Sequence, residues 1–240
     1  EADRDLLSRL QAAQITYQGE KTDQEDLQKE LGVQKANLNS QKAAKANLLA
    51  ATKNDEKRFQ QLLAQAQAEY AAILGILAGK GVETEVGRVS ESQRIASIIQ
   101  GSSCNSSGSH VHFIVKEGSN TQNPFNYLKG EVDYENCSGS SCGSSDGDAF
   151  NPGGSWPWPI NPKIQLSQGY GSTWATRNTW VKSIYTFHNG IDINSSSSEV
   201  RAVRGGILFQ GYYGGKCLLK YVRVDHDDSN LDTLYLHVNW

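Results

Sequence analysis

The amino-terminal third of the chain constrains the fold more than any other feature. Residues 1–80 contain neither proline nor tryptophan and are rich in alanine, glutamine, leucine, lysine and glutamate. This composition favours long helices. Apolar side chains recur at three- and four-residue steps, which is typical of a coiled coil with irregularities. We therefore expect residues 1–80 to form a helical coiled coil rather than part of a globular core.

Two features predict a break within this helical stretch. Gly19 interrupts the apolar pattern, and Thr22 and Glu25 have the spacing of a capping box. We expect a short helix up to about Gln18 and a long helix over residues 23–78. That helix spans on the order of 84 Å and cannot bury its apolar stripe alone. It therefore needs a helical partner, from its own first segment, from upstream sequence or from a second subunit.

The rest of the chain reads as short strands separated by turns. Two β-rich parts, residues 81–128 and 156–240, flank a Ser/Gly-rich segment at 129–155. That segment has no hydrophobic period, so we expect a flexible linker without a packing role. The expected fold class is α+β, with a coiled-coil arm followed by a mostly antiparallel β domain. In the last part, strands are expected over residues 200–208, 218–224 and 231–238.

Charge and composition exclude some classes of protein. The net charge of −3 leaves no basic footprint for nucleic acid. There is no run of 18 apolar residues, so we expect no membrane span. The chain begins with Glu1 and has no methionine, which we interpret as a mature or trimmed fragment whose signal peptide is absent.

The four cysteines favour an oxidising compartment. Four cysteines allow three pairings. Cys137–Cys142 is the most economical bridge, inside the segment 129–155, and Cys104–Cys217 would then join the two β-rich parts. Paired C-x-x-C motifs are missing, so we do not expect the cysteines to bind zinc.

Four of the five histidines fall in three short motifs. His188 and Asp192 belong to an H-x-G-x-D sequence, His110 and His112 to an H-x-H sequence, and His237 ends a Y-x-H sequence. Imidazole and carboxylate groups suit zinc. Each motif alone has an ordinary explanation, because surface or core histidines at these spacings are common. The combination of the three motifs favours a metal site.

Together these motifs resemble the signatures of lysostaphin-type (LytM-type) zinc metallopeptidases, which cut peptide cross-links in bacterial cell walls. The resemblance covers residues 81–240. In the family the H-x-H motif comes last, whereas here it comes first, so the domain resembles a circularly permuted member. Permutation implies that Trp240 ends close to residues 81–86. A swapped dimer, in which 81–128 of one chain completes 156–240 of another, is the competing explanation.

The resemblance implies a role for each motif residue. His112, His188 and Asp192 are the expected ligands of one Zn²⁺ ion. His110 and His237 are the expected catalytic acid and base, in an order that the sequence leaves open. His226 matches a further histidine of the family, and we interpret it as structural.

Aromatic residues are concentrated just before the H-x-G-x-D motif that contains His188 and Asp192. We expect half of them in the core and the others along a groove for peptide or glycan. They are Trp156, Trp158, Tyr170, Trp174, Trp180 and Tyr185.

The function that follows from the resemblance is zinc-dependent hydrolysis of peptide bonds in bacterial peptidoglycan. The protein is then secreted or resident in the cell envelope. The coiled coil is expected to regulate the enzyme, or to dock it on a partner protein or a second copy. If it regulates by covering the site, a fragment starting near Gly81 cleaves faster than the full chain. The alternatives are a non-catalytic activator of another hydrolase and a structural wall-binding protein that holds zinc.

Overall fold

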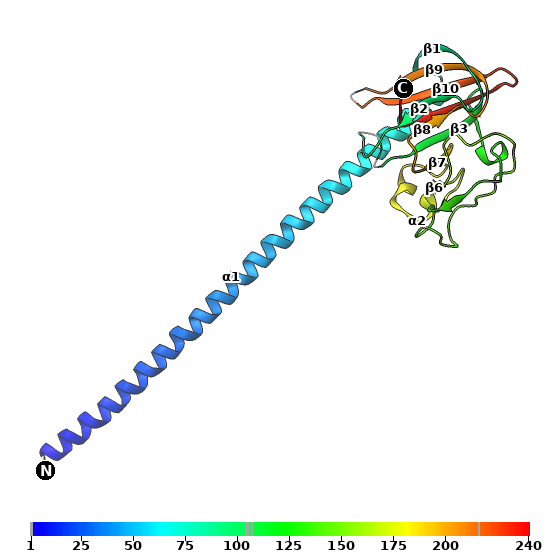
Figure 1. The fold of residues 1–240 in the computed structure, drawn as a ribbon. Coiled ribbons are helices and arrows are strands. Elements are labelled where there is room, and N and C mark those ends of the chain that lie inside the picture. Colours follow the sequence, from blue (N-terminus) through cyan, green and yellow to red (C-terminus); the bar gives the residue numbers. More distant parts are fainter. Residues whose placement is uncertain (1, 104–105, 107, 216) are drawn as a thin grey trace. The chain divides into compact units, whose positions relative to one another are not determined.

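The computed structural model describes residues 2–103, 106, 108–215 and 217–240. It divides into two compact units, Glu1–Gln60 and Gln61–Trp240. Helix α1 (Ala2–Leu77) supplies the first unit and the beginning of the second. A mostly antiparallel β domain follows it (Figure 1). The expected α+β class, a helix followed by a mostly antiparallel β domain, is confirmed.

The predicted break near Gly19 is wrong, because α1 continues through it. Thr22 does not cap a new helix, since its Oγ1 donates a hydrogen bond to the carbonyl oxygen of Gln18 one turn earlier (3.0 Å). A glycine inside a helix costs only about 1 kcal/mol relative to alanine. The good helix formers on both sides offset that cost.

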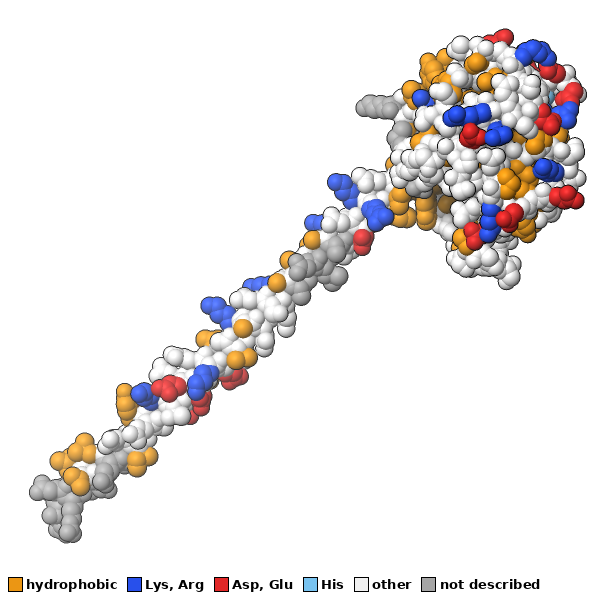
Figure 2. All heavy atoms as spheres, viewed as in Figure 1, with side chains coloured by type: hydrophobic (Ala, Val, Ile, Leu, Met, Phe, Trp, Pro, Cys, Tyr) orange, Lys and Arg blue, Asp and Glu red, His pale blue; other side chains and the backbone are white. Residues whose placement is uncertain are grey.

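Large apolar side chains lie exposed along the part of α1 in the first unit, interspersed with charged ones (Figure 2). Examples are Leu10 at 60%, Leu31 at 66% and Leu49 at 55% exposed. Among the described residues of this unit, α1 is the only helix or strand. A helical partner for a coiled coil therefore stays a prediction.

The strands of the second unit form two sheets (Figure 1). The larger sheet has the order β1-β9-β10-β11-β3-β7-β6-β5, with β4 beside β3, and the smaller has the order β12-β2-β8. Their strands are β1 (Val82–Val89), β2 (Arg94–Ile98), β3 (Val111–Glu117), β4 (Asn120–Gln122), β5 (Tyr134–Asn136), β6 (Ile164–Gln168), β7 (Ile191–Asn194), β8 (Glu199–Arg201), β9 (Gly206–Tyr213), β10 (Leu219–His226), β11 (Leu231–Leu236) and β12 (Val238–Asn239). The short helices are η1 (Pro124–Asn126), α2 (Trp174–Asn178) and η2 (Trp180–Ser183).

The strand predicted over residues 200–208 is two strands. β8 belongs to the smaller sheet and β9 to the larger one. Ala202 and Val203 connect them and are buried. The backbone N–H of Val203 donates to Tyr235 Oη (3.0 Å), so the connection is held inside the core. Apolar runs that pass between two sheets look the same in sequence as one buried strand.

The segment 129–155 is packed, and the prediction of a linker without a packing role is wrong. It contains β5, which pairs in parallel with β6. The Phe150 ring stacks on Tyr134, with ring centroids 3.7 Å apart, and on Trp158 at 5.5 Å. The Cys137–Cys142 disulfide is confirmed. The other expected bridge involves Cys104, which lies outside the described residues.

The end of the chain lies at the same end of the larger sheet as the start of β1. The ammonium group of Lys220 lies 4.4 Å from the centre of the Trp240 ring. Lys220 on β10 is paired with Tyr212 on β9, and Tyr212 is paired with Val82 on β1. Trp240 therefore contacts a strand two positions from β1, and the permuted order stays a prediction.

The last turns of α1 are part of the β domain. Ala72, Ile73, Ile76 and Leu77 are buried in one cluster with residues of the larger sheet. Their partners are Ile114, Leu219, Tyr221, Leu234 and Leu236. The described chain contains no helix that is both long and apolar enough to cross a membrane.

Ile76→Ala is expected to lower the free energy of unfolding of the β domain by about 2–5 kcal/mol, because the Ile76 side chain is only 4% exposed. Leu38→Ala, at a position 51% exposed on the same helix, serves as the control and changes stability little. Denaturant titration of the two variants measures the difference. Equal effects would mean that the end of α1 is not packed on the sheet.

Candidate metal centre

Strand pairing brings the expected zinc ligands together. His112 on β3 is the register partner of Asp192 on β7, and directly opposed side chains on one face of a sheet lie within reach of each other. His112 Nδ1 lies 2.8 Å from Asp192 Oδ1. His188 Nε2 lies 3.2 Å from His112 Nδ1 and 3.4 Å from Asp192 Oδ2. Sequence analysis selected these residues, and the fold places them in one group with the spacing of metal ligands.

Gly190 permits the close approach of the two strands between the ligands. A Cβ atom at this position would lie 2.4 Å from the Phe113 carbonyl oxygen and 2.9 Å from His112 Nε2. Both distances are too short for any side chain. The glycine of the H-x-G-x-D motif is therefore required by packing against the strand that carries His112.

The backbone selects the tautomer of His188. Its Nδ1–H donates to the carbonyl oxygen of Gly169 (2.6 Å), which leaves Nε2 unprotonated and facing His112 and Asp192. Asp148 holds Gly169 in turn, because its carboxylate accepts the Gly169 N–H (2.9 Å). A metal-binding histidine commonly has its other nitrogen fixed in this way. The segment 129–155 thus supports the site through Asp148.

The charges of His112, His188 and Asp192 favour a cation between them. Burial opposes the ionisation of Asp192, but the imidazoles of His188 and His112 hold the pKa of its carboxyl well below its usual range. Burial lowers the pKa of His112. Burial also opposes the charged form of His188, but Asp192 raises the pKa of this imidazole above its ordinary value. A carboxylate and two nitrogen lone pairs therefore converge, and they need either a proton or a metal ion between them.

The surroundings of one buried ligand atom fit a metal ion. Asp192 Oδ1 is buried and has no aligned hydrogen-bond donor in the described part of the chain, although His112 Nδ1 is only 2.8 Å away. Buried carboxylate oxygens are normally hydrogen-bonded or bound to a cation. Two imidazoles and one carboxylate with an open fourth position are a donor set that catalytic zinc uses. The residues therefore fit a zinc ion.

The two other motif histidines lie beside the ligands. His110 precedes β3, and its Nε2 lies 3.9 Å from Asp192 Oδ1. His237 lies between β11 and β12 with φ 62°, and its ring centre is 4.5 Å from that of His110. Burial lowers the pKa of both imidazoles, to about 4 for His237. The fold therefore brings together all five residues that the sequence selected.

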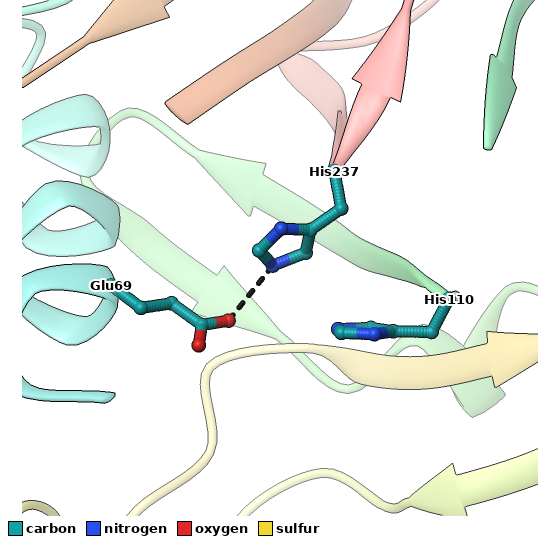
Figure 3. A group of neighbouring side chains, drawn as sticks. All are labelled: Glu69, His110 and His237. Atoms are coloured by element: carbon teal, nitrogen blue, oxygen red, sulfur yellow. Dashed lines mark hydrogen bonds and ion pairs between the residues drawn. The ribbon is translucent and has the colours of Figure 1, made fainter. Parts of the chain in front are cut away.

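Glu69 on α1 is the residue that sequence analysis missed. Its Oε1 accepts a hydrogen bond from His237 Nε2–H (2.8 Å), and the carboxylate faces His110 as well (Figure 3). Burial raises the pKa of Glu69 to about 7. Residues 1–80 contain six glutamates, and no local signal separates this one from the others.

The cleft at this site is small and is bounded by α1. Its volume is about 190 Å³, and Ala66, Glu69, Tyr70 and Ile73 of α1 form one side of it. The opposite side contains the ligands together with Tyr185, whose ring stacks on Tyr70 at 5.1 Å. Sites for drug-sized ligands usually have about 300–1,000 Å³. The cleft is therefore smaller than such sites while α1 forms one side of it.

Of the six aromatic residues, two are buried in the core and two line the cleft, and a groove for peptide or glycan stays a prediction. Trp156 and Trp158 are buried, at 9% and 6% exposed. Trp180 and Tyr185 line the cleft. His226 is structural, because it is buried and its nitrogens lie 3.3 Å from the Gly205 carbonyl oxygen and 3.1 Å from Thr233 Oγ1.

Comparison with protein-family models, with curated proteins and with solved structures found no match for this chain.

Proposed function

We propose that this protein is a zinc-dependent endopeptidase that hydrolyses peptide bonds of bacterial peptidoglycan outside the cytoplasm. The observation that carries the proposal is the convergence of His112, His188 and Asp192, which come from motifs 76 residues apart (188 − 112). Their likeness to the motifs of lysostaphin-type peptidases supports the reaction and the substrate class. The disulfide agrees with an oxidising compartment.

Each residue has a part in the proposed reaction. Zinc, when bound, lowers the pKa of a water ligand to about 7 and polarises a carbonyl group. His112, His188 and Asp192 hold the ion, and Gly169 keeps His188 in the correct tautomer. His110 and His237 lie beside them, and burial, which lowers the pKa of both imidazoles, favours the neutral form that would accept a proton from water and return it to the leaving amine.

The end of α1 would keep this enzyme latent. Glu69 occupies the space beside His110 and His237, where the reacting groups of a substrate would have to lie. Gln65 anchors the same stretch of helix, since its Nε2 donates to the Ser106 carbonyl oxygen (3.1 Å). Substrate entry therefore requires this part of α1 to move away.

Glu69→Ala is expected to increase the rate of peptidoglycan hydrolysis by the full chain about tenfold or more, because a hydrogen bond to a charged group contributes about 1.5–3 kcal/mol. A side-chain change is a cleaner test than the fragment starting near Gly81, which would expose the apolar cluster around Ile76. Glu56→Ala, at an exposed position of α1, is the matched control. An unchanged rate in Glu69→Ala would remove the proposed latency.

The test of the function itself combines a metal assay with a digestion. The purified chain is incubated with zinc and purified peptidoglycan, and the released peptides are identified by mass analysis. The expected result is metal-dependent release of peptides with a new amino terminus at the cut bond. Zinc binding without release, in both the full chain and Glu69→Ala, would exclude the peptidase.

One observation favours a second function, that of an activator of another hydrolase. The cleft beside the expected ligands is narrow and bounded by α1, which suits a protein whose helix responds to a partner. In that case the chain binds zinc and releases no peptides by itself, but increases digestion when a second wall hydrolase is added. The complete ligand set favours the enzyme.

A further inference from the structure

A second cluster of metal-binding side chains lies against the first. Glu69 on α1, His110 before β3 and His237 after β11 each offer a ligand atom, and these atoms lie within 4.8 Å of one another. The three side chains point toward a common space from three different elements (Figure 3). Two imidazoles and a carboxylate are again a donor set that suits zinc.

The backbone prepares His110 for this role as it prepares His188 for the first site. The His110 Nδ1 lies 3.2 Å from the carbonyl oxygen of Gly108, to which its N–H donates. The proton is therefore held on Nδ1, and Nε2 is left with a lone pair. A fixed tautomer with the free nitrogen turned toward carboxylates is typical of a metal ligand.

The position of Glu69 also suits a metal ligand. Its side chain is 23% exposed and its Oε1 lies 2.8 Å from His237 Nε2, on the side of α1 that faces the two imidazoles (Figure 3). A partly buried carboxylate in such a place is stabilised by pairing or by a bound cation.

We propose that Glu69, His110 and His237 form a second divalent-cation site, of the zinc class, beside the His112–His188–Asp192 site. The two sites adjoin at Asp192, whose Oδ1 lies 3.9 Å from His110 Nε2. Such an ion joins α1 to the β domain and withholds His110 and His237 from proton transfer. The ion would therefore keep α1 over the cleft and the proposed enzyme inactive. The proposal goes beyond the proposed function and does not require the protein to be a peptidase.

His237 makes this the weaker of the two sites. When Nε2 binds the ion, the proton it now donates to Glu69 must leave, and a neutral ring then carries its proton on Nδ1. That nitrogen is buried and no described residue accepts a hydrogen bond from it. His188 in the first site leaves no N–H without a partner, because the carbonyl oxygen of Gly169 accepts a hydrogen bond from its Nδ1–H.

The test is a titration of the metal-free full chain with Zn²⁺, and with Co²⁺ as a spectroscopic probe. We expect two ions per chain, one tight and one weaker. Glu69→Gln should lower the affinity of the weaker ion by about 100-fold or more, since loss of even an outer-shell partner typically costs 10- to 100-fold. His188→Ala should do the opposite, by removing the tight ion and keeping the weaker one. Glu56→Gln is the control for a charge lost from α1.

A single ion in the wild-type chain, or an unchanged weaker ion in Glu69→Gln, would overturn the second site. Circular dichroism establishes that each variant is folded. If Glu69→Gln is not, Glu69→Asp replaces it, because the shorter carboxylate keeps the charge but withdraws it from the two imidazoles. Metal stoichiometry is independent of hydrolysis, so failure of the peptidase proposal is distinguishable from failure of this one.

Discussion

We expect His188→Ala or His112→Ala to remove the tightly bound zinc and to abolish the proposed peptidoglycan hydrolysis. Each change deletes one of two imidazoles whose nitrogens lie 3.2 Å apart and converge with Asp192. The loss of metal affinity should exceed about 100-fold, because outer-shell changes alone typically cost 10- to 100-fold. Asp192→Ala is expected to behave in the same way. Zinc content after dialysis against a weak chelator, followed by a digestion assay, measures both effects.

A matched histidine supplies the control for these variants. His226→Gln changes an imidazole that is equally buried but lies beside Gly205 and Thr233 rather than the ligands. It should retain the tight ion. If His188→Ala kept its zinc, the ligand assignment would be wrong, however the activity responded.

His110→Ala and His237→Ala are expected to keep the tight zinc ion and to lower the rate of hydrolysis by about 10²- to 10⁴-fold, the usual contribution of acid–base catalysis. Neither residue belongs to the group formed by His112, His188 and Asp192. The effect should fall on kcat, because the two imidazoles act on protons of the reaction rather than on the bound peptide.

The metal content of the His237→Ala variant decides whether His237 is a ligand of the first site or an acid–base residue. A His237→Ala protein as free of tight zinc as His188→Ala would make His237 a ligand of the first site and overturn the acid–base assignment. The same variant should lose the weaker ion, so the two classes of ion must be measured separately. The Glu69→Ala background, in which the Glu69 side chain no longer occupies the space beside His110 and His237, makes the rate comparison most sensitive.

Local sequence signals were sufficient for the candidate ligands and for most strands. The imidazole and carboxylate motifs around His110, His188 and His237 are recognisable because each needs only two to five consecutive residues. The strands β3, β10 and β11 follow from short apolar and β-branched runs. The Cys137–Cys142 bridge follows from proximity along the chain.

Predictions that depended on long-range packing fared worse. The segment 129–155 looks like a linker because its order comes from a few contacts, such as the Phe150 ring and the Asp148 carboxylate, rather than from a periodic apolar pattern. The break predicted at Gly19 failed for a different reason, since helix propensity over many residues outweighs one glycine.

The amino-acid sequence by itself determined which side chains are able to bind a metal ion, and that a long helix precedes a β domain. The tertiary structure alone decided that β3 pairs with β7, which sets His112 opposite Asp192. It also decided that Glu69, 168 residues before His237, lies within hydrogen-bonding distance of it. Strand register and helix docking are set by burial of apolar surface between distant segments. That burial is a property of the folded chain as a whole, and no local stretch encodes it.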